Sequence, residues 1–212
     1  MPTKAIRCIT TVIITASALA IPSGPVSAAA DPKPPRAALL TVADLPAGFQ
    51  PADELNDVLE PGQPDPAICT NPVAVGSVVN RPAITSYASF FRKTDGLLVY
   101  EILIGAGPDR ARKLVADLGR APKTCPRVRL GDLTLSVSRM SVPDLGAQAS
   151  GVLIETGGEP AIRTRLIVFA EGGVTAIVMA VGAQDVGLRG MHTIALSASR
   201  KLSASGKLAP SN

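Results

Sequence analysis

The stretch AIRTRLIVFAEGGVTAIVMAV, residues 161–181, predicts two long β-strands joined by a tight turn. In its first half, apolar residues on one face alternate with Arg163 and Arg165 on the other. Such alternation is typical of a strand with one covered face. The Glu-Gly-Gly sequence at 171–173 supplies the turn. The second half, 174–181, is apolar on both faces, which favours a position in the middle of a sheet.

Similar patterns outside this stretch predict an α+β domain. Further strands are predicted over 85–92, 97–104, 133–138 and 151–155. Helices are predicted from Pro108 to about Leu118, where Gly119 ends the pattern, and from about Asp185 to Leu202. Because hairpin turns join most strands, we expect a curved, mainly antiparallel sheet of about six strands with helices packed on it. The domain is expected to span 38–203, between a proline-rich linker at 31–37 and a flexible tail at 204–212.

Residues 1–30 have the composition of a secretory signal peptide. A short basic start precedes an uncharged apolar stretch, and small residues lead to a cleavage site after Ala28 or Ala30. An uncleaved anchor is the alternative, but the strongly apolar part is shorter than the roughly twenty residues that span a bilayer. Cys8 precedes the apolar stretch, which argues against a lipid anchor. We therefore predict a secreted protein with no stable membrane anchor after cleavage.

The composition argues against nucleic-acid partners. The formal net charge of the whole chain is +4, and two of the positive charges leave with the signal peptide. Aromatic residues make up 3% of the chain, with no tryptophan. Binding of phosphates needs a dense basic face, and stacking of bases needs aromatic side chains. The chain has a small net charge and few aromatic residues, so no nucleic-acid partner is expected.

Cys8 lies in the predicted signal peptide and is lost when that segment is cleaved. The remaining cysteines are Cys69 and Cys125. An even pair in an oxidising compartment predicts one structural disulfide. Closing so long a loop stabilises a fold by roughly 4 kcal/mol in the chain-entropy model. A redox or metal site is disfavoured, because the chain has no CxxC motif and His192 is its only histidine.

No motif for catalysis, metal binding or cofactor binding emerges from the sequence. Gly105-Ala106-Gly107 lies between a strand and a helix, but Arg110 stands where a dinucleotide-binding loop has its third glycine. A nucleophile motif of the form GxSxG is absent, and His192 lies beside the apolar face of a predicted helix. The five carboxylates between 53 and 65 lack the spacing of a calcium loop and predict a solvated acidic loop. We therefore predict no enzymatic activity, no cofactor and no metal.

Three arginines are the candidate ligand-binding residues. Arg139, Arg163 and Arg165 lie on predicted strands together with the hydroxyl-bearing residues Thr134, Ser136 and Ser138. If the sheet brings them together, they form a basic surface that can hold an anionic ligand through charge-assisted hydrogen bonds. The alternative is ordinary solubilising charge on solvent-facing strand positions.

The order of these features resembles a known family. Leu39-Leu40 and Asp44-Leu-Pro-Ala-Gly-Phe49 open the domain, Cys69 follows, Cys125 comes just after the first long helix, and an amphipathic helix ends it. This arrangement is similar to secreted or membrane-tethered sensor-type domains of actinobacteria, such as the extracellular domain of PknH-type receptor Ser/Thr kinases. The resemblance implies an α/β sandwich with a cleft, a ligand-binding role and no catalytic residues. The chain differs in having no kinase domain and one cysteine pair, and in lacking a tryptophan near the second cysteine.

We therefore expect a secreted, non-enzymatic ligand-binding or sensor-like protein of the cell envelope or extracellular space. Its partner is expected to be a small-molecule or envelope ligand, or another exported protein. One alternative is a secreted hydrolase that uses an unrecognised carboxylate pair. Another is a structural or inhibitory protein that binds its partner through an exposed apolar patch.

Overall fold

The computed structural model describes residues 34, 36–52, 85–130, 133–145, 147–184 and 186–206. The predicted signal peptide and Cys69 lie outside these residues. The described helices are η1 (Arg36–Ala38) and η2 (Val42–Asp44), both 3₁₀, and the α-helices α2 (Pro108–Thr124) and α3 (Gly187–Gly206). The described strands are β1 (Phe49–Pro51), β2 (Thr85–Arg92), β3 (Leu97–Gly105), β4 (Arg127–Leu130), β5 (Leu133–Met140), β6 (Gln148–Thr156), β7 (Arg163–Glu171) and β8 (Val174–Gly182). Among these residues, no helix is both long enough and apolar enough to cross a membrane.

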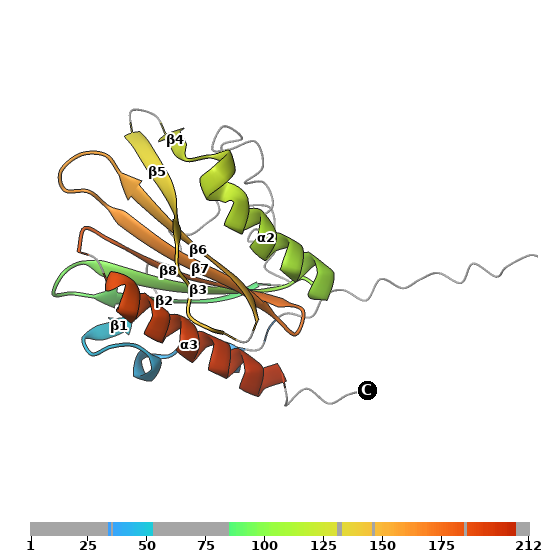
Figure 1. The fold of residues 1–212 in the computed structure, drawn as a ribbon. Helices are drawn as coiled ribbons and strands as arrows, with labels where there is room; N and C mark the ends of the chain where they lie inside the picture. The colour runs from blue at the N-terminus through green and yellow to red at the C-terminus, as the bar shows by residue number, and fades with distance from the viewer. Residues whose placement is uncertain are drawn as a thin grey trace, which may run out of the picture. The chain divides into compact units, whose positions relative to one another are not determined.

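The described strands form one antiparallel sheet in the order β1-β2-β3-β8-β7-β6-β5-β4. Strands β1 to β3 make one run of neighbours, strands β4 to β8 make another, and α2 carries the chain between them (Figure 1). The two runs meet where β3 pairs with β8, from Leu98 opposite Val181 to Gly105 opposite Val174. The centre of the sheet therefore joins segments that lie far apart in the sequence.

The hairpin of β7 and β8 forms where the sequence predicts it. Gly172 and Gly173 have φ angles of 55° and 83°, a left-handed conformation that glycine adopts at little cost. Four consecutive residues of β8, from Thr175 to Val178, are buried. Because neighbouring side chains in a strand point to opposite faces, this burial confirms that β8 is covered on both sides.

The two faces of the sheet are covered by different helices. On one face, α2 packs through Leu114 and Val115 against Ile104, Val168 and Ile177. On the other face, α3 packs against η1 and against β7 and β8 (Figure 1). The domain is therefore α+β, as predicted, with a helix on each side of the sheet.

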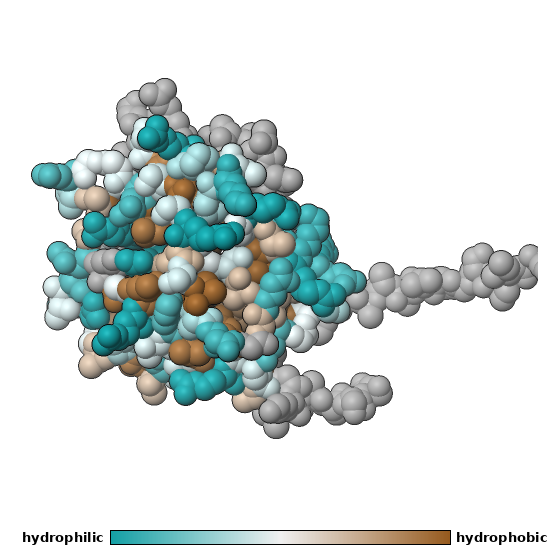
Figure 2. All heavy atoms as spheres, in the orientation of Figure 1, coloured by the Kyte–Doolittle hydropathy of each residue, from teal (hydrophilic) through white to brown (hydrophobic). Residues whose placement is uncertain are grey.

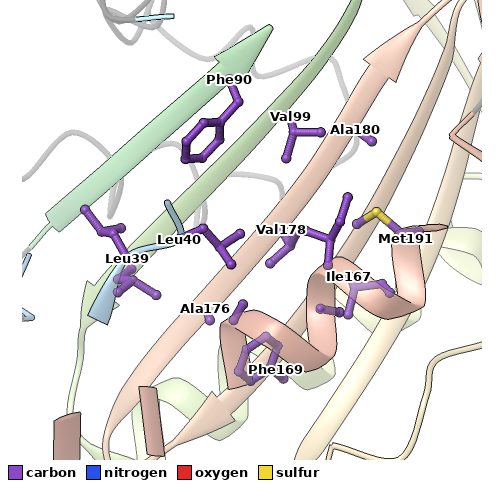
Figure 3. Close-up of a cluster of buried hydrophobic side chains, with 14 of the residues drawn as sticks. Leu39, Leu40, Phe90, Val99, Ile167, Phe169, Ala176, Val178, Ala180 and Met191 are labelled. Atoms are coloured by element: carbon purple, nitrogen blue, oxygen red, sulfur yellow. The ribbon is translucent and has the colours of Figure 1, made fainter. Parts of the chain in front are cut away.

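The larger core lies on the α3 face. Helix α3 contributes a buried stripe of Met191, Ile194, Ala195, Ala198 and Leu202. Figure 3 shows Leu39 and Leu40, from the segment around η1, directed at the same side of the sheet as Val178. The N-terminal segment and the C-terminal helix therefore share one core.

The described sheet has eight strands where about six were predicted. The two additional strands are β1 and β4, with three and four residues respectively. Segments this short give no recognisable alternation of apolar and polar residues. Both lie at the edges of the sheet, where strands are often short.

The helix boundaries also differ from the prediction. Helix α2 does not end at Gly119 but continues to Thr124. A Cβ atom at position 119 would lie 2.4 Å from Ser150 Oγ in β6, so glycine allows α2 to approach the sheet closely. This glycine is a packing residue rather than a helix end. Helix α3 reaches Gly206, inside the segment predicted as a tail.

Cys125 follows α2 directly and is half-buried beside a small cluster that contains Val128, Val137 and Val152. Its predicted partner, Cys69, lies outside the described residues. The Cys69–Cys125 disulfide therefore stays a prediction.

Candidate functional site

Two of the three predicted ligand-binding arginines share one face of the sheet. Arg163 and Arg165 stand two residues apart in β7, so their side chains point to the same side. In β6, Glu155 lies opposite Arg163 and Leu153 lies opposite Arg165. One strand farther, in β5, Ser136 lies opposite Glu155 and Ser138 lies opposite Leu153. The structure thus places the two arginines and these two serines on the same face of the sheet, with β6 between them.

Arg139 lies on the opposite face from this pair. It alternates with Ser138 and is in register with Val152, which belongs to a core cluster on the α2 side of the sheet. The predicted surface of three arginines does not form. Successive side chains in a strand point to opposite faces of the sheet, so Arg139 points away from the face that carries Ser138.

The charge of the remaining pair is partly compensated. Arg163 Nε lies 2.9 Å from Glu155 Oε1, and both side chains are well exposed. Arg165 is half-buried, and its Nη1 lies 3.3 Å from Met140 Sδ. An exposed ion pair contributes at most about 1 kcal/mol, but it does reduce the attraction of Arg163 for an anion. This part of the sheet is therefore a weaker anion site than the sequence suggests.

A groove lies elsewhere on the α3 side, between that helix and the segment 141–145. It has a volume of about 640 Å³. Two side chains of α3 hold this segment by its backbone. His192 Nε2 lies 3.0 Å from the carbonyl oxygen of Ser141, and the hydroxyl of Ser199 donates to the carbonyl oxygen of Leu145 at 3.3 Å. His192 therefore contacts the backbone of this segment, as Ser199 does.

The lining of the groove is amphipathic. It consists of the apolar residues Leu145, Leu196 and Ala204 together with the polar residues Asp144, Ser199, Arg200 and Ser203. Leu196 keeps 38% of its surface exposed. The guanidinium of Arg200 lies along its own helix, donating to the Leu196 carbonyl and to Ser197 Oγ, both at 3.2 Å. In the view of Figure 2, apolar patches lie near the middle of the face with hydrophilic residues around them.

A partly buried carboxylate, that of Glu171, lies next to one end of this groove. Ser203, which lines the groove, donates a hydrogen bond to Oε1 of Glu171 at the end of β7. The other oxygen, Oε2, is buried and has no hydrogen-bond partner among the described residues. Unpaired buried carboxylate oxygens are uncommon in folded proteins, since each loses its hydration without compensation.

A second carboxylate lies at the centre of the sheet. Glu101 of β3 is fully buried on the α3 face, between Val99 and Leu103. Its Oε2 accepts a hydrogen bond from the backbone N–H of Leu40, and its Oε1 has no partner among the described residues. Desolvation raises the pKa of Glu101 to about 7, and the Leu40 N–H and the charge of Lys201 offset this only in part.

The sequence analysis missed both the groove and the role of Glu101. The one available signal for Glu101 was a single charged residue in the apolar stretch of residues 97–104. The groove depends on how the segment 141–145 lies beside α3. No local pattern predicts that contact, since the two segments are about fifty residues apart.

No family model matches the chain, and no curated protein matches it. Among solved structures, CalU16 from Micromonospora echinospora covers 58% of the chain (94% of its own) at 12% identity and a TM-score of 0.30. A STAR-related lipid transfer protein fragment from Xanthomonas axonopodis covers 57% (93% of its own) at 11% identity and a TM-score of 0.25. These two scores are too low to support an argument.

A third solved structure is more similar. The extracellular domain of PknH from Mycobacterium tuberculosis matches with a TM-score of 0.55 and 15% identity, over 79% of this chain and 94% of that one. The likeness concerns the fold. It confirms the resemblance that the sequence predicts, because this chain shares the fold of the extracellular domain of PknH.

Proposed function

We propose that this protein is a secreted, non-enzymatic sensor-like domain that binds a small amphipathic molecule in the groove beside α3. The observation that carries the proposal is the lining of the groove, where exposed leucine surface adjoins hydroxyl groups and the charges of Asp144 and Arg200. Small-molecule sites are commonly concave and mainly apolar, with a few polar groups that orient the ligand.

Two further observations support the extracellular part of the proposal. The fold is similar to a domain described as the extracellular part of PknH, and residues 1–30 have the composition of a signal peptide. In an oxidising compartment, Cys69 and Cys125 are expected to form the predicted disulfide. The ligand is then a component of the cell envelope or of the surrounding medium.

Binding of an amphiphilic fluorescent probe tests the groove. The probe 8-anilinonaphthalene-1-sulfonate joins an apolar ring system to one anionic group, so its rings suit Leu196 and its sulfonate suits Arg200. We expect saturable fluorescence enhancement that Leu196→Glu weakens at least fivefold, because a carboxylate then occupies the apolar wall. Leu188→Glu is the matched control, since Leu188 lies on the same helix, is also 38% exposed and is not among the residues that line the groove.

Equal loss of binding in the two variants would place the probe outside the groove and remove the support for this site. The non-enzymatic part has a separate test. Turnover of generic ester, glycoside or peptide substrates that disappears on substitution of a carboxylate would favour the hydrolase alternative instead.

A further inference from the structure

The segment 36–45, here called the N-terminal strap, covers the middle of the α3 face. It contains η1 and η2 and places Ala38, Leu39 and Leu40 in the main core (Figure 3). Because the strap is short and contains only 3₁₀ turns, its position depends on tertiary contacts rather than on its own helical hydrogen bonds.

Two of the contacts that hold the strap involve ionisable groups. The backbone N–H of Leu40 donates to Oε2 of the buried Glu101. Near the other end of the strap, Asp44 Oδ2 accepts a hydrogen bond from Lys201 Nζ of α3 at 2.8 Å. The same Asp44 oxygen accepts hydrogen bonds from the backbone N–H and the hydroxyl of Thr41, each at 2.7 Å.

The surroundings of Glu101 suit a neutral carboxyl better than a charged one. Its cross-strand neighbours are Ala88 in β2 and Val178 in β8, neither of which can donate a side-chain hydrogen bond. The charged groups that act on it are Asp44 from the strap, which repels a negative charge, and Lys201 from α3, which already pairs with Asp44. A carboxylate at this position is therefore poorly compensated while the strap is in place.

From this geometry we infer that the N-terminal strap is a latch, which the protonated form of Glu101 keeps closed and which ionisation of Glu101 loosens. Departure of the strap lets water reach the carboxylate. It also uncovers the apolar surface beneath Leu39 and Leu40, which a partner can then contact. This inference does not depend on the ligand proposed for the groove.

The direction of the pH effect follows from linkage. Burial raises the pKa of Glu101 to about 7 with the strap closed, whereas an exposed glutamate titrates near 4.5. Glu101 therefore binds its proton more tightly when the strap is closed. The equilibrium constant for opening of the strap rises with pH between these two pKa values and levels off above the higher one. Acidification closes the latch.

Hydrogen exchange of the full-length protein at pH 5 and pH 8 tests the latch. After correction for intrinsic exchange rates, we expect the opening constant of the amides in 36–45 to rise at least tenfold from pH 5 to pH 8. In Glu101→Gln the rise should be less than twofold, because the amide still accepts from Leu40 but carries no charge. Amides of Ala111 to Val115 in α2 report global opening, and their opening constants should stay well below those of the strap at both pH values.

Glu155→Gln is the matched control, since it removes a carboxylate on the sheet surface and should behave like the wild type. Lys201→Met gives a second, independent readout that does not require the Glu101 variant to fold. Loss of its positive charge should increase opening of the strap more at pH 8 than at pH 5. The latch is overturned if the opening constant of the strap is the same at both pH values, or if the strap and the α2 amides have equal opening constants, which would mean that the strap opens only when the whole domain unfolds.

Discussion

Lys201, near the end of α3, donates a hydrogen bond to Asp44 in η2 across 157 positions of sequence. The side chains of the two residues are 25% and 24% exposed, so the pair is less screened by water than a fully exposed one. Desolvation raises the pKa of Asp44, but hydrogen bonds from Lys201 and Thr41 outweigh it, and the pKa is lowered overall. The pair fastens the first described segment of the domain to its last helix.

Asp44→Asn is expected to lower the free energy of unfolding at pH 6 by about 1 kcal/mol, since it weakens both the ion pair and the cap on η2. Because the folded state lowers the pKa of Asp44, this contribution is present above the unfolded-state pKa and is lost as the pH falls through the folded one. Urea unfolding at pH 6 and pH 3 should show the difference shrinking in acid. Equal stability of the two proteins at pH 6 would contradict the prediction.

Glu101→Gln is expected to stabilise the whole domain at pH 8 and to have little effect at pH 4. Because the folded state raises the pKa of Glu101, the free energy of unfolding is highest below the unfolded-state pKa of this residue. It falls as the pH rises toward 7. A shift from 4.5 to about 7 corresponds to a free energy on the order of 3 kcal/mol. Denaturant midpoints measured between pH 4 and pH 8 check this, and a wild-type stability that rises over that range would disprove it.

Gly151→Ala is expected to destabilise the fold by roughly 1–3 kcal/mol, the usual cost of overpacking a buried position. A Cβ at this position would lie 2.6 Å from the carbonyl oxygen of Met140, which is backbone and cannot turn aside. Gly157→Ala is the control, because its Cβ would come no closer than 3.7 Å to the carbonyl oxygen of Thr134. The two urea midpoints should differ clearly, and similar midpoints would show that β5 and β6 can separate at little cost.

Reduction of the protein without residues 1–30 is expected to expose two thiols, from Cys69 and Cys125. Alkylation followed by intact mass measurement should add two labels after reduction and none before it. Cys125→Ser should lower the free energy of unfolding by about 2–4 kcal/mol through loss of the closed loop. Two labels without reduction, under oxidising conditions, would rule the disulfide out.

The sequence predicted those parts of the fold that depend on local patterns. The hairpin of β7 and β8 could be predicted from its alternation and its paired glycines, and most of helix α3 from its helical pattern. The edge strands were missed because three or four residues carry too little pattern.

The candidate sites were harder to predict, because they depend on tertiary contacts. Arg163 and Arg165 could be assigned to one face because alternate residues of a strand point to the same side. Arg139 lies in another strand, and the sequence does not show which of its residues point to that side. Glu101 appeared as an interruption in an apolar strand, and nothing local indicated that Leu40 would cover it. Predicting the groove required knowing that the segment 141–145 lies beside α3. Contacts such as that of Ser199 with Leu145 set this position.

The pairing of β3 with β8 bears on the order in which the chain can fold. Apart from β1, each of the two runs consists of strands that follow one another in the sequence, but the runs join only when residues 174–182 are present. Glu101 and the strap then obtain their cover from α3, the last helix of the domain. Contacts this distant in sequence form late and slowly. For a chain exported through the signal peptide proposed here, the core is therefore expected to be complete only once residues 174–206 have also crossed the membrane.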